Sequence, residues 1–163
     1  MEMKRLRNSP GPAIAGQLHG KCVMCGADNP VGLQLRFART QPDVVESDLR
    51  IPARFQGYNG MAHGGIVASV LDAAMTRCLM AAGVVAVTGD LAVRYKLPVP
   101  IGGLLHARGL LEQSTKHVYK MRAELWQQRK LLATATARFV KAPEAFKQAV
   151  ENEATRRADG GKA

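Results

Sequence analysis

The chain has 163 residues, 47% of them hydrophobic and 22% charged, and its formal net charge is +10. This length fits a single domain with a sizeable core, and no stretch reaches the roughly 18–20 uncharged apolar residues of a membrane span. The basic start lacks the apolar run of a secretory signal, and three cysteines are too few for a disulfide framework. We therefore expect a cytoplasmic protein without a membrane partner.

The positive charge is spread through the chain rather than gathered in one segment. Nucleic acid, a membrane surface and a small polyanionic ligand are the three partners that such a charge suggests. Nucleic-acid modules usually concentrate basic residues and add a recognisable motif, and neither is found, so we expect no nucleic-acid partner. A polyanionic ligand steered by a basic rim explains part of the charge. The local basic clusters lie near the two ends: Lys4, Arg5, Arg7 and Arg156, Arg157, Lys162.

The first third of the chain begins with a segment rich in Gly and Pro, residues 1–20, which is predicted to be flexible. A Cys-x-x-Cys-Gly element follows at residues 22–26. Apolar and polar residues alternate over residues 33–37, which predicts a strand, and a second strand is predicted over residues 44–51. Residues 56–60 are predicted to form a loop.

One long helix is predicted over residues 63–82, ended by Gly83. It is nearly apolar on all sides, which is typical of a buried helix. The strands that follow are joined by short links, which favour antiparallel pairing. The pattern therefore predicts an α+β fold, with an antiparallel β-sheet wrapped around one long central helix. These later strands are predicted over residues 84–97, 104–113, 117–127 and 131–140.

We divide the chain into a flexible N-terminal segment (residues 1–20), one domain (residues 21–141) and a charged C-terminal helix or tail (residues 142–163). From Pro143 onward the residues become helix-forming and charged, and they end in a Gly-rich tail. No internal repeat and no second domain boundary is found in the sequence.

Three polar side chains share one face of the predicted helix. Ser69, Asp72 and Thr76 are spaced three and four residues apart. A buried carboxylate is costly unless it is paired, hydrogen-bonded or used in chemistry. A structural Asp bonded to a nearby hydroxyl is one interpretation. Because the remaining faces of the helix are apolar, we favour a functional Asp72.

The predicted helix begins at His63-Gly64-Gly65, with no Ser, Thr or Asn cap immediately before it. Its first N–H groups therefore need an outside partner. Glycines allow close approach of a ligand, and a helix N-terminus favours negative charge. These are the requirements of an oxyanion hole for acyl transfer, although a glycine turn bonded to water satisfies the same pattern.

Helix geometry constrains how these two groups can act together. Gly64 and Asp72 are eight residues apart, which is about 12 Å along a helix axis. One carbonyl cannot lie within about 3 Å of both groups on the same helix. Two antiparallel copies of the helix from different subunits would bring Gly64 of one near Asp72 of the other. If both groups are catalytic, the site lies at a subunit interface and occurs in pairs.

Several of these motifs occur together in one known family. The motifs are residues 60–65, residues 69–74, residues 86–91 with residues 94–98, and the segment from residue 22 to Leu33. The chain resembles, from about residue 20 to residue 141, the phenylacetate-type (PaaI-like) thioesterases of the hotdog superfamily. The resemblance implies an acyl-CoA hydrolase in which a sheet wraps around a long helix.

The resemblance also implies roles for individual residues. Asp72 would be the general base that activates water, or else the nucleophile that attacks the thioester. The Gly64 N–H would polarise the thioester carbonyl, and His63 would shape the loop or touch the substrate. Thr76 and Thr88 would orient the water or the carboxylate.

Further substrate contacts are expected from Asn59, Gly65, Ser69 and Arg94. In the family an amide side chain often precedes the His-Gly-Gly motif, and Asn59 and Gln56 are nearby, but at spacings that do not align. Arg94, with Lys96 and Arg138, is a candidate for the phosphates of coenzyme A.

The Cys-x-x-Cys-Gly element raises the question of a metal. His19, Cys22 and Cys25 offer three ligands, whereas a structural zinc site usually needs four. We therefore expect no metal. Thioester hydrolysis needs no organic cofactor either, with coenzyme A entering as part of the substrate.

The leading functional prediction is hydrolysis of an acyl-CoA to the free acid and coenzyme A, by a homodimer or a dimer of dimers. A hotdog hydratase or dehydratase is an alternative that would use a His and an acid, such as His63 and Asp72. A non-catalytic acyl-CoA-binding or sensing module is another, because fold alone does not fix function.

Overall fold

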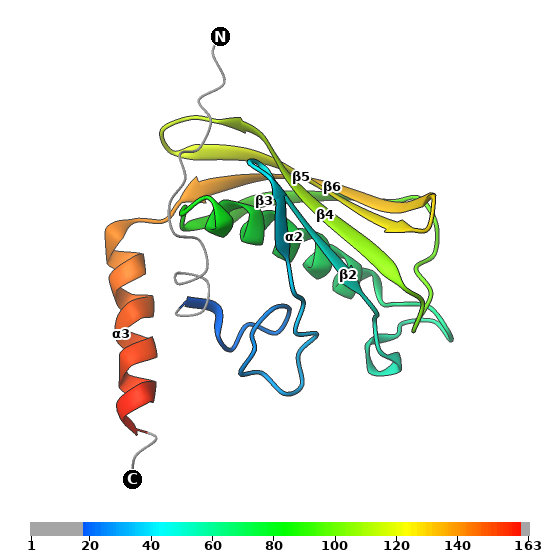
Figure 1. Ribbon diagram of the computed structural model, residues 1–163, viewed down its shortest axis with the longest axis horizontal. Coiled ribbons are helices and arrows are strands. Elements are labelled where there is room, and N and C mark those ends of the chain that lie inside the picture. The colour runs from blue at the N-terminus through cyan, green and yellow to red at the C-terminus, as the bar shows by residue number, and fades with distance from the viewer. Residues whose placement is uncertain (1–17, 161–163) are drawn as a thin grey trace.

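The computed structural model describes residues 18–160 of the chain (Figure 1). Residues 1–17 of the N-terminal segment predicted to be flexible therefore lie outside the described residues. So do Lys4, Arg5 and Arg7 of the first basic cluster and Lys162 of the second. We call residues 18–35 the leader.

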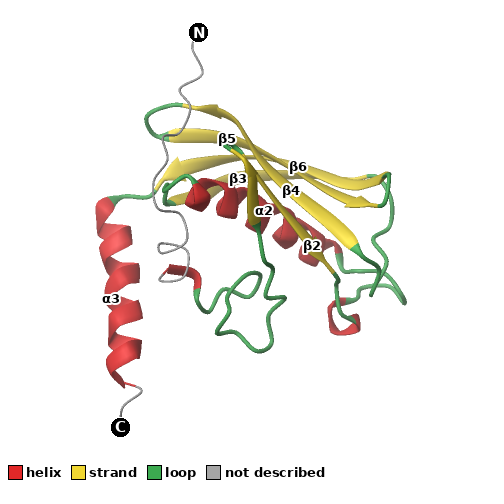
Figure 2. Cartoon of the chain, viewed as in Figure 1, coloured by secondary structure: helices red, strands yellow, loops and turns green. Residues whose placement is uncertain are grey.

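Six strands form one antiparallel sheet in the order β1-β2-β4-β5-β6-β3. The helix α2 crosses one face of this sheet and carries the chain from β2 to the opposite edge, where β3 lies (Figure 1). The strands are β1 (Ala38–Gln41), β2 (Val44–Leu49), β3 (Ala86–Tyr95), β4 (Leu105–Ser114), β5 (Val118–Gln127) and β6 (Lys130–Lys141). The helices are η1 (Ala53–Phe55), α2 (Gly64–Ala81) and α3 (Glu144–Gly160), and α3 extends away from the sheet (Figure 2).

The predicted fold class, a sheet wrapped around one long helix, is confirmed. The four strands predicted after the helix and the strand predicted over residues 44–51 each agree with an observed strand within one or two residues at either end. These segments carry apolar residues at strand spacing and end at turns, so local sequence decides them.

The strand predicted over residues 33–37 is wrong, because the first strand begins only at Ala38. Gln34 has a φ of +48°, in the left-handed region, which interrupts an extended chain. The Leu33 and Leu35 N–H groups instead donate to the carbonyls of Val23 (2.9 Å) and Met24 (2.8 Å). The leader therefore folds back on itself beside the sheet.

The helix α2 has the predicted extent, between His63 as N-cap and Ala82 as C-cap, and Gly83 follows with a φ of +75°. The expectation of a buried helix holds for one side of α2. Its apolar residues pack on the sheet, whereas Ser69, Asp72 and Thr76 are only half-buried. By length and composition α2 (18 residues, mean hydropathy 1.3) is apolar enough to cross a membrane, but so is the core helix of many sheet-wrapped domains.

A glycine sets how closely α2 approaches the sheet. A Cβ atom on Gly109, in β4, would lie 2.4 Å from the carbonyl oxygen of Ala74 and 3.1 Å from the amide nitrogen of Met75. These are backbone atoms of α2 and cannot rotate away. The missing side chain therefore allows the helix to rest directly on β4.

We expect Gly109→Ala to lower the free energy of unfolding by about 1–3 kcal/mol, because α2 must shift away from β4 to accept the methyl group. Urea denaturation followed by circular dichroism measures this. The control is Gln113→Ala, at an exposed position of the same strand, which should change stability by less than about 0.5 kcal/mol. Equal stability of Gly109→Ala and wild type would show that the helix is not held at this contact.

Candidate active site

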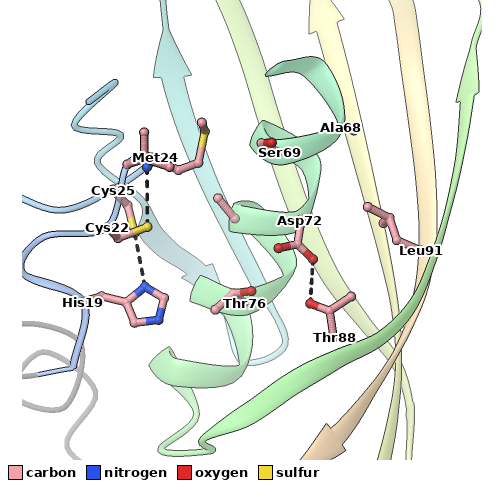
Figure 3. Close-up of a pocket in the computed structure, with 12 residues that line it drawn as sticks. His19, Cys22, Met24, Cys25, Ala68, Ser69, Asp72, Thr76, Thr88 and Leu91 are labelled. Atoms are coloured by element: carbon pink, nitrogen blue, oxygen red, sulfur yellow. Dashed lines mark hydrogen bonds between the residues drawn. The ribbon is translucent and has the colours of Figure 1, made fainter. Parts of the chain in front are cut away.

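Asp72 lines a cavity of about 420 Å³ beside α2. Three parts of the chain line it: leader residues 19 and 22–25, the α2 face that includes Ser69 and Thr76, and Thr88 with Leu91 from β3 (Figure 3). The structure therefore brings together four of the predicted site residues, Ser69, Asp72, Thr76 and Thr88.

The Asp72 carboxylate is held by one hydroxyl. Thr88 Oγ1 donates a hydrogen bond of 2.8 Å to Asp72 Oδ1, and Figure 3 shows the two side chains pointing toward each other. Burial raises the pKa of Asp72 above its ordinary value, while the Thr88 hydrogen bond acts in the opposite direction. A raised pKa and a fixed orientation are properties of many carboxylates that transfer protons in catalysis.

The neighbouring hydroxyls differ in how they are used. Ser69 Oγ donates to the Gly65 carbonyl at 2.8 Å, so its proton is committed to the helix backbone and only its lone pairs face the cavity. Thr76 lies one turn beyond Asp72 and also lines the cavity.

The N-terminus of α2 corrects one expectation, because the helix does have a cap. His63 Nδ1 accepts the Gly65 N–H at 3.0 Å. The Gly65 N–H is therefore satisfied, and within the described residues the Gly64 N–H has no hydrogen-bond partner. Tyr95 Oη donates to the Gly64 carbonyl at 2.7 Å and fixes this peptide from the other side. One exposed donor, the Gly64 N–H, remains free for a ligand.

Within one chain, the Gly64 N–H, the predicted oxyanion donor, lies far from the Asp72 carboxylate. Gly64 and Asp72 belong to one unbroken helix, eight residues apart, or about 12 Å along the axis. Neither Gly64 nor His63 lines the Asp72 cavity.

Three predicted substrate contacts, Asn59, Gly65 and Arg94, also lie outside the cavity. Asn59 is exposed in the loop before α2, where Gln56 Oε1 accepts the Gly60 N–H at 3.3 Å. Arg94 is exposed on β3. Of the other cations suggested for coenzyme A, Arg138 forms an ion pair with Asp90.

Sequence reasoning missed two features of the site. The leader forms a wall of the cavity, through residues that include His19, Met24 and Cys25. Tyr95 was noticed only as part of a motif, although its hydroxyl positions the Gly64 peptide. Both depend on contacts between segments far apart in sequence, which leave no periodic pattern.

Comparisons with known proteins bear on the family and the fold. Residues 59–134 match the model of the thioesterase superfamily. Over 88 residues the chain is 30% identical to the mouse (Mus musculus) acyl-coenzyme A thioesterase THEM4, covering 53% of this chain and 38% of the mouse protein. The chain thus spans well under half of that relative.

Two solved structures extend the comparison. A phenylacetic acid degradation-related protein from Ralstonia eutropha is 27% identical, with a TM-score of 0.61, over 81% of this chain and 92% of that one. The smu.793 protein of Streptococcus mutans, solved bound to acetyl CoA, is 18% identical, with a TM-score of 0.62, over 66% of this chain and 88% of that one. These findings confirm the predicted resemblance to the PaaI-like thioesterases and the hotdog fold.

We expect Asp72→Asn to raise the melting temperature at neutral pH. Burial penalises the charged form, and an Asn side chain still accepts the Thr88 hydrogen bond without that penalty. A carboxyl whose pKa is raised on folding costs stability above that raised pKa, and the cost vanishes below the unfolded value near 3.8. The difference between variant and wild type should therefore shrink as the pH is lowered through the raised pKa.

Differential scanning calorimetry from pH 7.5 down to acid measures this, with Asp28→Asn, at an exposed position, as the matched control. A lower melting temperature for Asp72→Asn at neutral pH would mean that the carboxylate stabilises the fold, and would contradict the prediction.

Proposed function

We propose that the protein is an acyl-CoA thioesterase, which hydrolyses an acyl-CoA to the free acid and coenzyme A. The observation that carries the proposal is a half-buried Asp72, oriented by Thr88, at the wall of a cavity large enough for an acyl group. The match of residues 59–134 to the thioesterase superfamily supports it.

Asp72 acts on the thioester in one of two ways. As a general base, it takes a proton from water while the water oxygen attacks the carbonyl carbon, and it returns the proton to the coenzyme A sulfur as the C–S bond breaks. As a nucleophile, it attacks the carbonyl carbon, the C–S bond breaks and coenzyme A leaves as the thiolate, and water then hydrolyses the resulting acyl anhydride to the free acid and the Asp72 carboxylate. In both cases the Thr88 hydroxyl is bonded to Asp72 Oδ1. Asp72 Oδ2 is then the oxygen that takes the proton from water or attacks the carbonyl carbon.

The developing negative charge on the carbonyl oxygen needs a donor, and the Gly64 N–H is suited to this. It is exposed at a helix N-terminus, and His63 and Tyr95 fix the groups on either side of it. Because this donor is about 12 Å from Asp72 along the same helix, it has to come from a second subunit. We therefore propose a site shared between the two chains of a homodimer, or of a dimer of dimers.

The edge of the sheet supports dimerisation. β3 is an edge strand, and its apolar residues Val87, Leu91 and Tyr95 are 38%, 36% and 52% exposed. An edge strand with apolar side chains is a template for pairing with another chain. The same strand carries Thr88, so pairing there would bring the second subunit to the Asp72 cavity.

The substrate proposal rests on charge and on likeness. Coenzyme A carries about four negative charges, which a net charge of +10 would steer toward the site. The similar proteins include a mouse acyl-coenzyme A thioesterase and a Streptococcus mutans protein bound to acetyl CoA. Asn59 and Arg94, both exposed, are proposed to contact the coenzyme A portion rather than the acyl group.

Two further elements of the proposal concern setting and chemistry. The reaction draws on Asp72, hydroxyls and a backbone N–H, and uses no metal or organic cofactor. A cytoplasmic setting fits the three free thiols, Cys22, Cys25 and Cys78.

The structure favours hydrolysis over hydration of a double bond. A hydratase needs an imidazole that is free to move protons at carbon, whereas His63 Nδ1 is committed to capping α2. His63 therefore shapes the loop.

The first test is thiol release from a panel of short-chain, medium-chain and arylacetyl-CoA substrates. We expect Asp72→Asn to lower turnover by about a hundredfold or more, with Asp28→Asn unchanged. Binding without thiol release from any substrate would refute hydrolysis and favour the acyl-CoA-binding module. A new double bond or hydroxyl without thiol release would favour the hydratase.

Removal of the Gly64 N–H tests the oxyanion donor. Gly64 is the first residue of α2 and is not among the glycines with positive φ, and His63 before it is extended, so proline fits this position. We expect Gly64→Pro to lower kcat by about 10²–10³-fold, while Gly64→Ala, which keeps the N–H, stays within a few-fold of wild type.

A heterodimer tests whether the site is shared. Co-expression of Asp72→Asn and Gly64→Pro chains with different tags allows tandem purification of the mixed dimer. One of its two sites then combines an intact Gly64 with an intact Asp72, so we expect about half of wild-type activity from two inactive parents. A heterodimer as inactive as its parents would place both groups in one subunit and contradict the shared site.

A further inference from the structure

The leader contains a cluster of soft metal ligands that the proposed hydrolysis does not use. Nδ1 or Nε2 of His19, Sγ of Cys22 and Sγ of Cys25 all lie within 4.8 Å of one another. Figure 3 shows the three side chains converging from one tight turn, on the wall of the Asp72 cavity. All three cysteines of the chain are free thiols, so this pair is not joined in a disulfide.

The spacing of the cluster fits a tetrahedral ion. Zinc lies about 2.3 Å from a thiolate sulfur and about 2.0–2.1 Å from an imidazole nitrogen, so a tetrahedral angle sets sulfur and nitrogen about 3.6 Å apart. Cys25 Sγ and His19 Nδ1 are 3.7 Å apart. A cation placed between them would meet both ligands with little movement of the turn.

The backbone holds this turn in place. The Cys22 N–H donates to the His19 carbonyl at 3.1 Å, and the Gly26 N–H donates to the Cys22 carbonyl at 2.9 Å. A Cβ atom on Gly26 would lie 2.4 Å from the Cys22 nitrogen and from the Gly20 oxygen, so only glycine fits here. The Met24 N–H donates to Cys22 Sγ at 3.4 Å, a bond that favours the thiolate.

A divalent cation bound to the cluster would displace the thiol protons and leave two thiolates, with no net charge on the set of two sulfurs, imidazole and ion.

We propose that His19, Cys22 and Cys25 bind one Zn²⁺ ion, with the fourth position open to water on the cavity side. Two thiolates and an imidazole are ligands that select zinc among common divalent cations. Counting ligands in the sequence argued against a structural site of four, but three protein ligands with an open fourth position are also an established zinc arrangement.

The ion would fasten the leader to the cavity. Met24 and Cys25 are buried in the hydrophobic core, and the leader backbone pairs residues 23 and 24 with residues 33 and 35. Zinc would tie the free end of this element, at His19, to its buried end. The proposal concerns the shape of the cavity wall and stands apart from hydrolysis by Asp72, so either can fail without the other.

The test uses the full chain without a histidine tag, purified with a phosphine reductant in zinc-supplemented buffer and then dialysed. Mass spectrometry of the metal content should find about one zinc per chain. The zinc content should fall to near zero in each of the variants Cys22→Ser, Cys25→Ser and His19→Ala. Cys78→Ser and His117→Ala, which change the same residue types outside the cluster, should keep the ion.

Two measurements on the wild-type protein keep the test independent of variants that fail to fold. Co²⁺ added to the zinc-free protein should give thiolate-to-cobalt charge transfer and the d–d bands of a tetrahedral site. Zn²⁺ should protect Cys22 and Cys25 of the folded protein from alkylation, as mapped by peptide mass spectrometry. It should not protect the same two cysteines once the protein is denatured. Three results would overturn the proposal: equal zinc in wild type and a Cys22→Ser/Cys25→Ser variant, no thiolate–cobalt band, or a Cys22–Cys25 disulfide in the freshly reduced protein.

Discussion

One unbroken helix separates the two groups on which the proposed acyl transfer depends. α2 is one continuous helix from Gly64 to Ala81, so the free N–H at its start and the Asp72 carboxylate stay about 12 Å apart along its axis. A reacting carbonyl has to lie about 3 Å from both. The proposed chemistry would therefore require a second copy of the helix, so that assembly would be a condition of catalysis.

The edge strand β3 connects the parts of this arrangement. Its Thr88 orients Asp72, and its Tyr95 holds the Gly64 carbonyl, so one strand fixes both ends of the α2 stretch from Gly64 to Asp72. Its exposed apolar residues also make it the surface most suited to a second subunit. The pKa of Asp72, which burial raises, fits the same picture, because functional groups are commonly retained where they destabilise the fold.

Sequence patterns predicted the elements whose side chains repeat at a regular period, and failed where one distant contact decides the outcome. The strands after α2 alternate or run apolar over about ten residues, and the helix carries its polar stripe at three- and four-residue spacing, so both were predictable. The residue spacing within α2 also predicted that Ser69, Asp72 and Thr76 share a face. The interruption at Gln34, the His63 cap and the contact of Gly109 with Ala74 each depend on a single conformation or on a partner far along the chain.

The site divides between the part of the chain that matches the thioesterase superfamily and the part that does not. Residues 59–134 supply Asp72, Thr88 and the Gly64 peptide, which are the groups proposed to act on the thioester. The opposite wall of the cavity, residues 19 and 22–25, lies outside that match. The groups proposed to react therefore all lie in the matched segment, whereas the cavity wall is shared between that segment and the leader. We expect a change in the leader to alter which acyl group fits while leaving the reacting groups untouched. A rigid leader would select between acyl groups of similar size better than a mobile one, because a mobile wall adapts to either group. The Gly26 turn and the buried Met24 already restrain it at one end. An ion held by His19, Cys22 and Cys25 would restrain it at the other.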